Sequence, residues 1–328
     1  MKLLTYRTGT GSRAALVLDG STLPLREGVT VLDVVRAGLP VQPDRWVSDE
    51  PGLDPSSLVL DVPYRPPTVR DFVAFEEHVE GVRKAVDGVG GVVDQWYEYP
   101  TFYFTNPYAL VATGDPVPVP QASARLDFEL EVGIVIGRSG HDLAPARAHE
   151  NVFGFTIFND WSARDLQSRE MKVNLGPAKG KDFATTIGPV IVTADELRDH
   201  LGSDGFLDLA MVVSVNGSEV GRDLLSNMGW PIGDLVAYAS RDTWVHPGDL
   251  LGTGTCGNGG CLAELWGRSG SLVPPPLQPG DVVTMTVEGI GTITNEVVAG
   301  VATPAIPRAR QRPRNRPDDA RLARARAQ

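Results

Sequence analysis

Short apolar runs separated by glycine, proline and aspartate dominate the chain, and this pattern predicts a β-rich fold with many turns. Residues 132–136 read Val-Gly-Ile-Val-Ile and predict a buried strand, and residues 207–215 and 282–287 predict two more. Asn216-Gly217 predicts a tight hairpin turn after the second of these strands. Helical spacing is confined to short segments, at residues 31–37, 76–86, 161–170, 194–201 and 231–240. We therefore expect a mainly β structure, a rolled sheet or a barrel, with a few short helices.

The chain divides into three segments by composition. Residues 1–62 contain short strand-like runs and one helical segment, which Thr30 can cap and Gly38 can end, so they predict a small N-terminal α+β module. Residues 63–303 carry all of the candidate chemistry and predict one larger catalytic domain. Residues 304–328 are rich in arginine, proline and alanine, a composition that predicts a disordered tail.

The net charge of −11 is unevenly distributed along the chain. Residues 307–328 hold eight Arg and two Asp, a charge of +6, so that the remainder carries −17. An acidic body of this kind argues against nucleic acid as the main partner. The first residues lack the apolar core of a signal peptide, and no apolar run reaches transmembrane length. We therefore expect a cytoplasmic protein that binds neither nucleic acid nor membrane.

Two cysteines, Cys256 and Cys261, are separated by four residues. This spacing fits no common zinc motif, and the chain has no further cysteine to complete one. We expect both to be free thiols.

Two glutamates stand just before the predicted strand at residues 132–136. Glu129 and Glu131 are two positions apart, so a strand points both side chains to the same face. Two carboxylates on one buried face repel each other and lose hydration, so they need a cation, a shared proton or an arginine. A hard divalent metal would satisfy them, with Asp160 as a third oxygen ligand. The alternative is an exposed edge strand with solvated acids.

His78 lies near the start of the predicted helix at residues 76–86. A helix N-terminus disfavours the imidazolium cation, which suits a base that must be neutral at pH 7. The alternative is a surface histidine on a polar helix. Glu264 lies within the apolar run Leu262-Ala263-Glu264-Leu265. It is either a buried acid that needs a partner, for which His78 is a candidate, or an acid on the wet face of a strand.

Several motifs follow one another in a specific order between residues 62 and 298. They are Asp71…His78, Glu129-x-Glu131, Asn159-Asp160-Trp161-Ser162-Ala163-Arg164-Asp165-x-Gln167, Leu175-Gly176-Pro177 with Gly180-Lys181, Leu250-Leu251 with Gly254-Thr255, Glu264 and Gly289-x-Gly291. In residue types and spacing they resemble the fumarylacetoacetate hydrolase family. The seven-residue run that begins at Asn159, and its distance from the paired glutamates, are highly specific for that family. The resemblance implies the family's rolled mixed β-sheet.

The resemblance also implies a role for each matching residue. The family's ligands for Mg²⁺ or Mn²⁺, with Ca²⁺ as a further ion of the same class, match Glu129, Glu131 and Asp160. A fourth ligand found in fumarylacetoacetase-type enzymes matches Asp71, seven residues before His78. The catalytic histidine and the glutamate that works with it match His78 and Glu264. The groups that stabilise an oxyanion match Arg164, Gln167 and Lys181.

The substrate contacts are less well matched. Thr255 corresponds to a substrate-contacting threonine, and Tyr103 belongs to an aromatic stretch that is a candidate pocket wall. Met171 stands where fumarylacetoacetase has a substrate-contacting tyrosine, and residues 256–261 match no family pattern. Asp127 shares the strand face of the two glutamates, and we interpret it as structural and not as a ligand.

Together these matches imply a hydrolase that cleaves a carbon–carbon bond in a 1,3-dicarbonyl acid, such as a 2,4-dioxo acid. His78, held by Glu264, would activate the attacking water. The family also contains decarboxylases, isomerases and hydratases of 2-oxo acids, so one of these is the alternative activity. A non-catalytic binding protein on the same fold is a second alternative, against which the intact set of acids argues. Family members are usually dimers, so we expect a homodimer.

Overall fold

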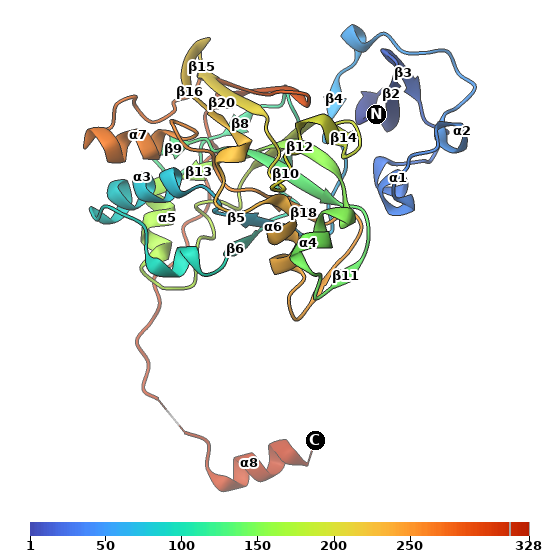
Figure 1. Cartoon of the computed structure of the whole chain (residues 1–328). Coiled ribbons are helices and arrows are strands. Elements are labelled where there is room, and N and C mark those ends of the chain that lie inside the picture. Colours follow the sequence, from blue (N-terminus) through green and yellow to red (C-terminus); the bar gives the residue numbers. More distant parts are fainter. Residues whose placement is uncertain (315, 328) are drawn as a thin grey trace.

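A large mixed sheet forms the centre of the protein. The structure is a computed structural model that describes residues 1–314 and 316–327 (Figure 1). Eleven strands make up this sheet, in the order β3-β2-β1-β14-β12-β10-β18-β5-β6, with β4 beside β1 and β7 beside β14. Their bounds are β1 Lys2–Thr8, β2 Gly11–Leu18, β3 Ser21–Pro24, β4 Leu60–Asp61, β5 Val69–Phe72, β6 Phe102–Thr105, β7 Leu110–Val111, β10 Leu130–Ile136, β12 Val152–Asp160, β14 Thr185–Thr193 and β18 Leu250–Gly252.

The two middle strands, β10 and β12, are buried along their whole length. They pair antiparallel, with Leu130 opposite Asn159 and Glu131 opposite Phe158. Both strands are covered on each face, which explains why their sequences read as nearly continuous apolar runs and not as an alternating pattern. The predicted buried strand at residues 132–136 is confirmed, and it holds Glu131 at the middle of the sheet.

A second, five-stranded sheet has the order β16-β15-β19-β20-β8. Its strands are β8 Val117–Pro118, β15 Ala210–Val215, β16 Ser218–Leu224, β19 Val282–Val287 and β20 Gly291–Val298, and two short pairs join β11 Gly140–His141 to β17 Trp244–Val245 and β9 Leu126–Asp127 to β13 Ser162–Ala163. The predicted hairpin at Asn216-Gly217 is confirmed, with both residues at positive φ. Within the described residues neither sheet closes on itself. The β-rich rolled fold is therefore confirmed, and the barrel form of the prediction is wrong.

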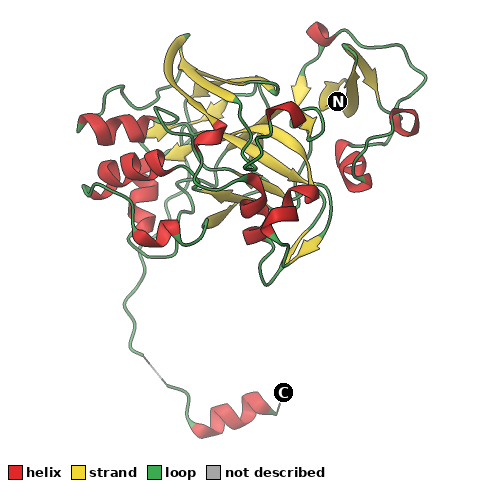
Figure 2. Cartoon of the chain, in the orientation of Figure 1, coloured by secondary structure: helices red, strands yellow, loops and turns green. Residues whose placement is uncertain are grey.

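The helices are short and lie around the sheets (Figure 2). They are α1 Val31–Ala37, α2 Pro43–Trp46, α3 Glu76–Asp87, α4 Pro145–Ala148, α5 Arg164–Met171, α6 Ile232–Ala239, α7 Leu262–Ser269 and α8 Asp319–Arg326, with single 3₁₀ turns at Pro55–Ser57, Asp94–Tyr97, His149–Asn151, Arg198–His200 and Leu225–Asn227. Helix α3 packs against α7 beside the β5 end of the large sheet. None of the helices within the described ranges is long and apolar enough to cross a membrane.

Two of the expected local structures are wrong. The helix expected at residues 194–201 is absent from the described residues: strand β14 continues to Thr193, whose hydroxyl bonds both the amino group and the carbonyl of Met1 and so caps no helix. Residues 262–265 form the first turn of α7 and not a strand. The N-cap of α7 is Cys261, whose sulfur accepts the backbone N–H of Glu264.

The N-terminal segment shares its sheet with the rest of the chain. Strand β1 pairs antiparallel with β14, with Leu3 opposite Ile191. Leu3 and Val35 also belong to one buried cluster with Phe153 and Phe158 of β12. The division of the chain at residue 62 stays a prediction. The same holds for the disordered tail, in which the structure places the exposed helix α8 away from the sheets (Figure 1).

Candidate active site

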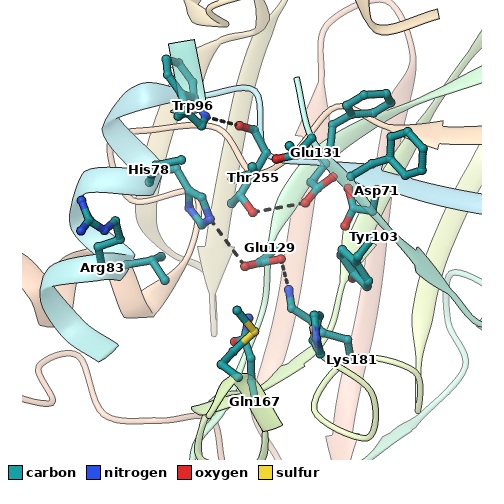
Figure 3. A pocket seen from close by; sticks show the side chains of 18 of the residues that line it. Asp71, His78, Arg83, Trp96, Tyr103, Glu129, Glu131, Gln167, Lys181 and Thr255 are labelled. Atoms are coloured by element: carbon teal, nitrogen blue, oxygen red, sulfur yellow. Dashed lines mark hydrogen bonds and ion pairs between the residues drawn. The ribbon is translucent and has the colours of Figure 1, made fainter. Parts of the chain in front are cut away.

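A pocket of about 440 Å³ brings most of the predicted site residues together. Strands β5 and β6, strand β10, helices α3 and α5 and the loops after α5 and β18 surround it (Figure 3). Ten predicted residues line it: Asp71, His78, Tyr103, Glu129, Glu131, Arg164, Gln167, Met171, Lys181 and Thr255. Asp160 lies just behind this lining and bonds two of its members, whereas Glu264 lies apart.

Three carboxylates meet at the floor of the pocket. Oxygen atoms of Asp71, Glu129 and Glu131 lie within 4.8 Å of one another, and all three residues are buried. Thr255 donates its hydroxyl to Glu131 at 3.2 Å, and the backbone N–H of Gly254 donates to the same carboxylate at 2.9 Å. The neighbouring Gly252 leaves room for this cluster, because a Cβ there would lie 2.9 Å from Glu131 Oε2.

Two cations lie against one edge of the acid cluster. Lys181 pairs with Glu129 and, at 2.6 Å, with Asp160, while Arg164 pairs with Glu129 at 2.7 Å. Burial disfavours the Glu129 carboxylate, but the charges of Lys181 and Arg164 outweigh it and lower the pKa of Glu129. Glu129 is therefore ionised, with each of its oxygens facing a cation.

Asp127 has a structural role, as interpreted from the sequence. Its carboxylate accepts the backbone N–H groups of Leu262 and Ala263 at 2.8 and 3.0 Å, at the start of α7. It also pairs with Arg164 at 2.8 Å. Arg164 in turn donates to the amide oxygen of Gln167 at 3.1 Å, so that Asp127 helps to orient two of the α5 side chains that line the pocket.

The other acids lack enough positive charge. Burial, with the repulsion of neighbouring carboxylates, raises the pKa of Asp71 and of Glu131 well above their ordinary values. Burial also raises the pKa of Asp160, although Lys181 opposes this. One oxygen each of Asp71 and Asp160 is buried without a hydrogen-bond partner among the described residues. A dense set of buried carboxylate oxygens with unused lone pairs fits a hard divalent cation, whose preferred ligands are oxygens.

His78 lies in the pocket wall across from the acids (Figure 3). Its Nε2 is 3.8 Å from Glu129 Oε1, and its Nδ1 is 3.6 Å from the sulfur of Cys261. Burial lowers the pKa of His78 to about 4, and the attraction of Glu129 only partly opposes this. The imidazole is therefore neutral at pH 7, as the sequence predicted, although burial contributes more than the helix N-terminus that motivated the prediction.

Glu264 is buried but is bonded elsewhere. It pairs with Arg268, one turn later on α7, and accepts the backbone N–H of Gly259 at 3.2 Å. Its stem packs on α3 at Gly81, where a Cβ would lie 2.5 Å from Glu264 Cγ. Among the described residues no hydrogen bond joins Glu264 to His78, so their pairing stays a prediction.

The buried Glu264 predicts a pH dependence of stability. Burial raises the pKa of Glu264 from 4.5 to about 7, so the folded protein holds this proton more tightly than the unfolded chain does. Its contribution to the free energy of unfolding is therefore full below pH 4.5 and is lost as the pH rises through about 7. At 1.36 kcal/mol for each pKa unit the loss is on the order of 3 kcal/mol. We expect Glu264→Gln to flatten the decline between pH 5 and pH 8, measured by urea unfolding. Glu77→Gln, which removes the exposed partner of the same arginine, is the matched control and keeps the wild-type slope.

Sequence reasoning missed two features of the pocket. Cys261 was interpreted only as a free thiol, because nothing in the sequence relates it to a histidine 183 positions away. The wall beyond His78 was also missed. It is apolar, and its members are Val79, Val82, Val93 and Trp96. The indole N–H of Trp96 is satisfied by the carbonyl of Val73 at 2.7 Å, so this side chain presents an apolar surface to the pocket.

Comparisons with known proteins agree with this fold. The family model described as "Fumarylacetoacetate (FAA) hydrolase C-terminal" matches residues 68–298, which is more than half of the chain. The protein therefore belongs to the fumarylacetoacetate hydrolase family. Members of this family are enzymes that include hydrolases, isomerases and tautomerases.

Individual relatives represent each of these activities. Oxaloacetate tautomerase YisK of Bacillus subtilis is 30% identical over 201 residues, which are 61% of this chain and 62% of that protein. The structure of a fumarylacetoacetate hydrolase from Exiguobacterium antarcticum is 28% identical with a TM-score of 0.71, covering 91% of this chain and 99% of that one. A 5-carboxymethyl-2-hydroxymuconate delta-isomerase from Mycobacterium smegmatis is 25% identical with a TM-score of 0.66, covering 91% and 100%. The chain spans about two thirds of the length of the curated relatives, 62% of the tautomerase and 66% of a Mycobacterium tuberculosis protein.

Proposed function

We propose that this protein is a divalent-metal-dependent hydrolase that cleaves a carbon–carbon bond in a 2,4-dioxo acid. The observation that supports this most is the buried, neutral His78, whose Nε2 points across the pocket toward the acid cluster. A neutral imidazole in that place can take a proton from water beside a substrate held on the acids. A tautomerase needs no such activated water.

The residues of the pocket have complementary roles in this proposal. Asp71, Glu129, Glu131 and Asp160 would hold Mg²⁺ or Mn²⁺, and the bound cation would act as a Lewis acid toward the dicarbonyl oxygens. His78 Nε2 takes one proton from water, and the hydroxide adds to the distal carbonyl carbon. Lys181, Arg164 and Gln167, which line the same pocket, would donate to the developing oxyanion. The tetrahedral carbon then releases its bond to the methylene carbon, which leaves with the electron pair and is protonated, giving a carboxylic acid and a 2-oxo acid.

The far wall of the pocket supports a substrate with an apolar substituent on the distal carbonyl. Val82, Val93 and Trp96 line this wall, and Met171 from α5 also lines the pocket. A terminal carboxylate placed against these side chains would lose hydration. Arg83 also lines the pocket and could pair with such a carboxylate, but its guanidinium already donates to the carbonyl of Gly91. We propose an alkyl or aryl acylpyruvate as the substrate, and a homodimer as the working form.

The second candidate function is a 2-oxo acid tautomerase or isomerase. The 30% identity to oxaloacetate tautomerase supports it, and so does the lack of a carboxylate hydrogen-bonded to the His78 ring among the described residues. In that reaction the acid cluster would again hold the cation that binds the substrate's carbonyl oxygens. His78 would transfer a proton between carbon and oxygen of the substrate and would not activate water.

A substrate screen distinguishes the two functions. We expect Mn²⁺- or Mg²⁺-dependent loss of the ultraviolet absorbance of an acylpyruvate, abolished by a chelator, with pyruvate and the free acid identified by mass spectrometry. Rates should be higher for benzoyl- or hexanoylpyruvate than for an acylpyruvate that ends in a second carboxylate. Conversion of oxaloacetate between its keto and enol forms, with no carboxylic acid released from any dioxo acid, would contradict hydrolysis and establish the second candidate.

A further inference from the structure

The ring of His78 has two neighbours of different chemistry. Its Nε2 lies 3.8 Å from Glu129, while its Nδ1 lies 3.6 Å from the sulfur of Cys261. Both residues are buried, His78 on α3 and Cys261 at the N-cap of α7, and these two helices pack against each other. A histidine acts as a base through one nitrogen only when the other carries the proton, so the group opposite Nδ1 selects the tautomer.

We propose that Cys261 is the positioning residue of His78: its sulfur accepts the Nδ1–H, which leaves Nε2 unprotonated toward the pocket. Cys261 would thus orient His78, the role that the family resemblance implied for Glu264. The catalytic consequence of this assignment rests on the proposed function. Cys261 does not touch the reacting atoms and acts only through the imidazole.

The surroundings of the sulfur favour an acceptor role. It already accepts the backbone N–H of Glu264 at 3.4 Å, as the cap of α7, and it also lies 3.6 Å from Nδ1 of His78 on the other helix. Burial raises the pKa of the Cys261 thiol well above its ordinary value, so the sulfur is a neutral thiol and not a thiolate. A neutral acceptor orients the ring without adding another negative charge to a pocket that already holds several buried carboxylates.

Glu129 does not compete for the ring proton. A free carboxylate 3.8 Å from Nε2 would favour a proton on that nitrogen. In this site the same Glu129 oxygen is 2.7 Å from Arg164, and the other oxygen pairs with Lys181. Each oxygen of Glu129 therefore faces a cation, and the two positive charges weaken the attraction of this carboxylate for an Nε2–H.

The recorded bonds of Glu264 lead away from His78. Its stem lies against Gly81, one turn further along α3 than His78, and its carboxylate is held by Arg268 and the N–H of Gly259. Cys261, at the N-cap of the same helix, contacts the imidazole, whereas no hydrogen bond joins Glu264 to it within the described residues.

The ring tautomer can be measured without substrate or metal. We expect long-range ¹H–¹⁵N spectra of the chelator-treated protein to show His78 as the Nδ1–H tautomer, its signals identified among the five histidines by their loss in His78→Gln. Cys261→Ser keeps both the acceptor and the helix cap, so it should keep this tautomer. Cys261→Ala should shift His78 toward Nε2–H. Cys256→Ala, which removes the other buried thiol, and Glu264→Gln should leave the tautomer unchanged.

Kinetics on the metal-loaded enzyme give the second readout. We expect Cys261→Ala to lower kcat by about 10–100-fold, the range typical for loss of a group that orients a site residue, with KM little changed and Cys261→Ser close to wild type. An unchanged tautomer in Cys261→Ala, or a tautomer shift in Glu264→Gln, would overturn the assignment. Because the spectra need no turnover, the tautomer result stands even when no dioxo acid is hydrolysed, so failure of the positioning role and failure of the proposed hydrolase are separable.

Discussion

Replacing Glu131 with glutamine is expected to abolish divalent metal binding while leaving the metal-free protein folded and no less stable. Glu131 is one of three carboxylates whose oxygens lie within 4.8 Å of one another, and it is the one held on strand β10 at the middle of the large sheet. Removing a group that only hydrogen-bonds to a metal ligand typically lowers metal affinity by about 10–100-fold. Removing the charge of a ligand itself should therefore lower the affinity by more than about 100-fold. Isothermal titration of chelator-treated protein with Mn²⁺ measures this directly.

The stability half of this expectation follows from the same cluster. Burial and the nearby Asp71 raise the pKa of Glu131, which means that the metal-free fold stores repulsion between these two acids. A neutral amide of the same size relieves that repulsion. Its oxygen can still accept the N–H of Gly254, and its NH2 group can donate to the hydroxyl oxygen of Thr255. The thermal midpoint of the metal-free variant should therefore equal or exceed that of the metal-free wild type, whereas added Mn²⁺ should raise only the wild-type midpoint.

Glu150→Gln is the matched control for both measurements. Glu150 is a half-exposed glutamate that pairs with Arg147 after α4, and it is not among the residues that line the pocket. This variant should bind Mn²⁺ as the wild type does. Wild-type Mn²⁺ affinity in Glu131→Gln would show that the acid cluster is not the metal site, and a lower thermal midpoint without metal would show that Glu131 is needed for folding.

The local part of the site could be predicted because it depends on strand parity and helix spacing. Glu129 and Glu131 are two residues apart on one segment, so an extended backbone is enough to bring their carboxylates to one face. The position of His78 at the start of α3 was visible for the same reason, since an apolar stripe at helical spacing follows it. The apolar sequence at residues 132–136 likewise predicts the burial of strand β10.

The rest depends on contacts between segments that are distant in the chain. Asp71 joins the cluster because β5 pairs with β18 and places it opposite Gly252, a register that no local pattern specifies. Cys261 reaches His78 only through the packing of α7 on α3, and the same packing turns Glu264 toward Arg268. The largely apolar residues 262–265 fit a strand as well as a helix. The helix begins at the N-cap Cys261, and cysteine is not a residue type that commonly caps helices.

Removing the imidazole of His78 is expected to separate hydrolysis from metal binding. A positioned general base contributes about 10²–10⁴-fold to rate, so His78→Ala should lower kcat for acylpyruvate hydrolysis by that factor. Mn²⁺ affinity should stay close to the wild-type value, because the acids of the cluster remain in place. His78→Gln, which fills the same space with a group that cannot act as a base at neutral pH, should lose as much activity and so exclude a collapsed cavity as the cause.

The same variant tests whether His78 is the base that activates water. In the proposed hydrolysis, substrate binding on the acid cluster precedes the use of the base, so KM should change little while pyruvate release is lost. If instead C–C hydrolysis persists in His78→Ala with unchanged kcat, water is activated elsewhere in the pocket and the base assignment is wrong. Burial keeps the imidazole of His78 neutral at pH 7, so it can accept a proton without first losing one. A base that activates water needs this property. An exposed histidine, whose pKa is close to 7, is neutral in only part of the molecules at that pH.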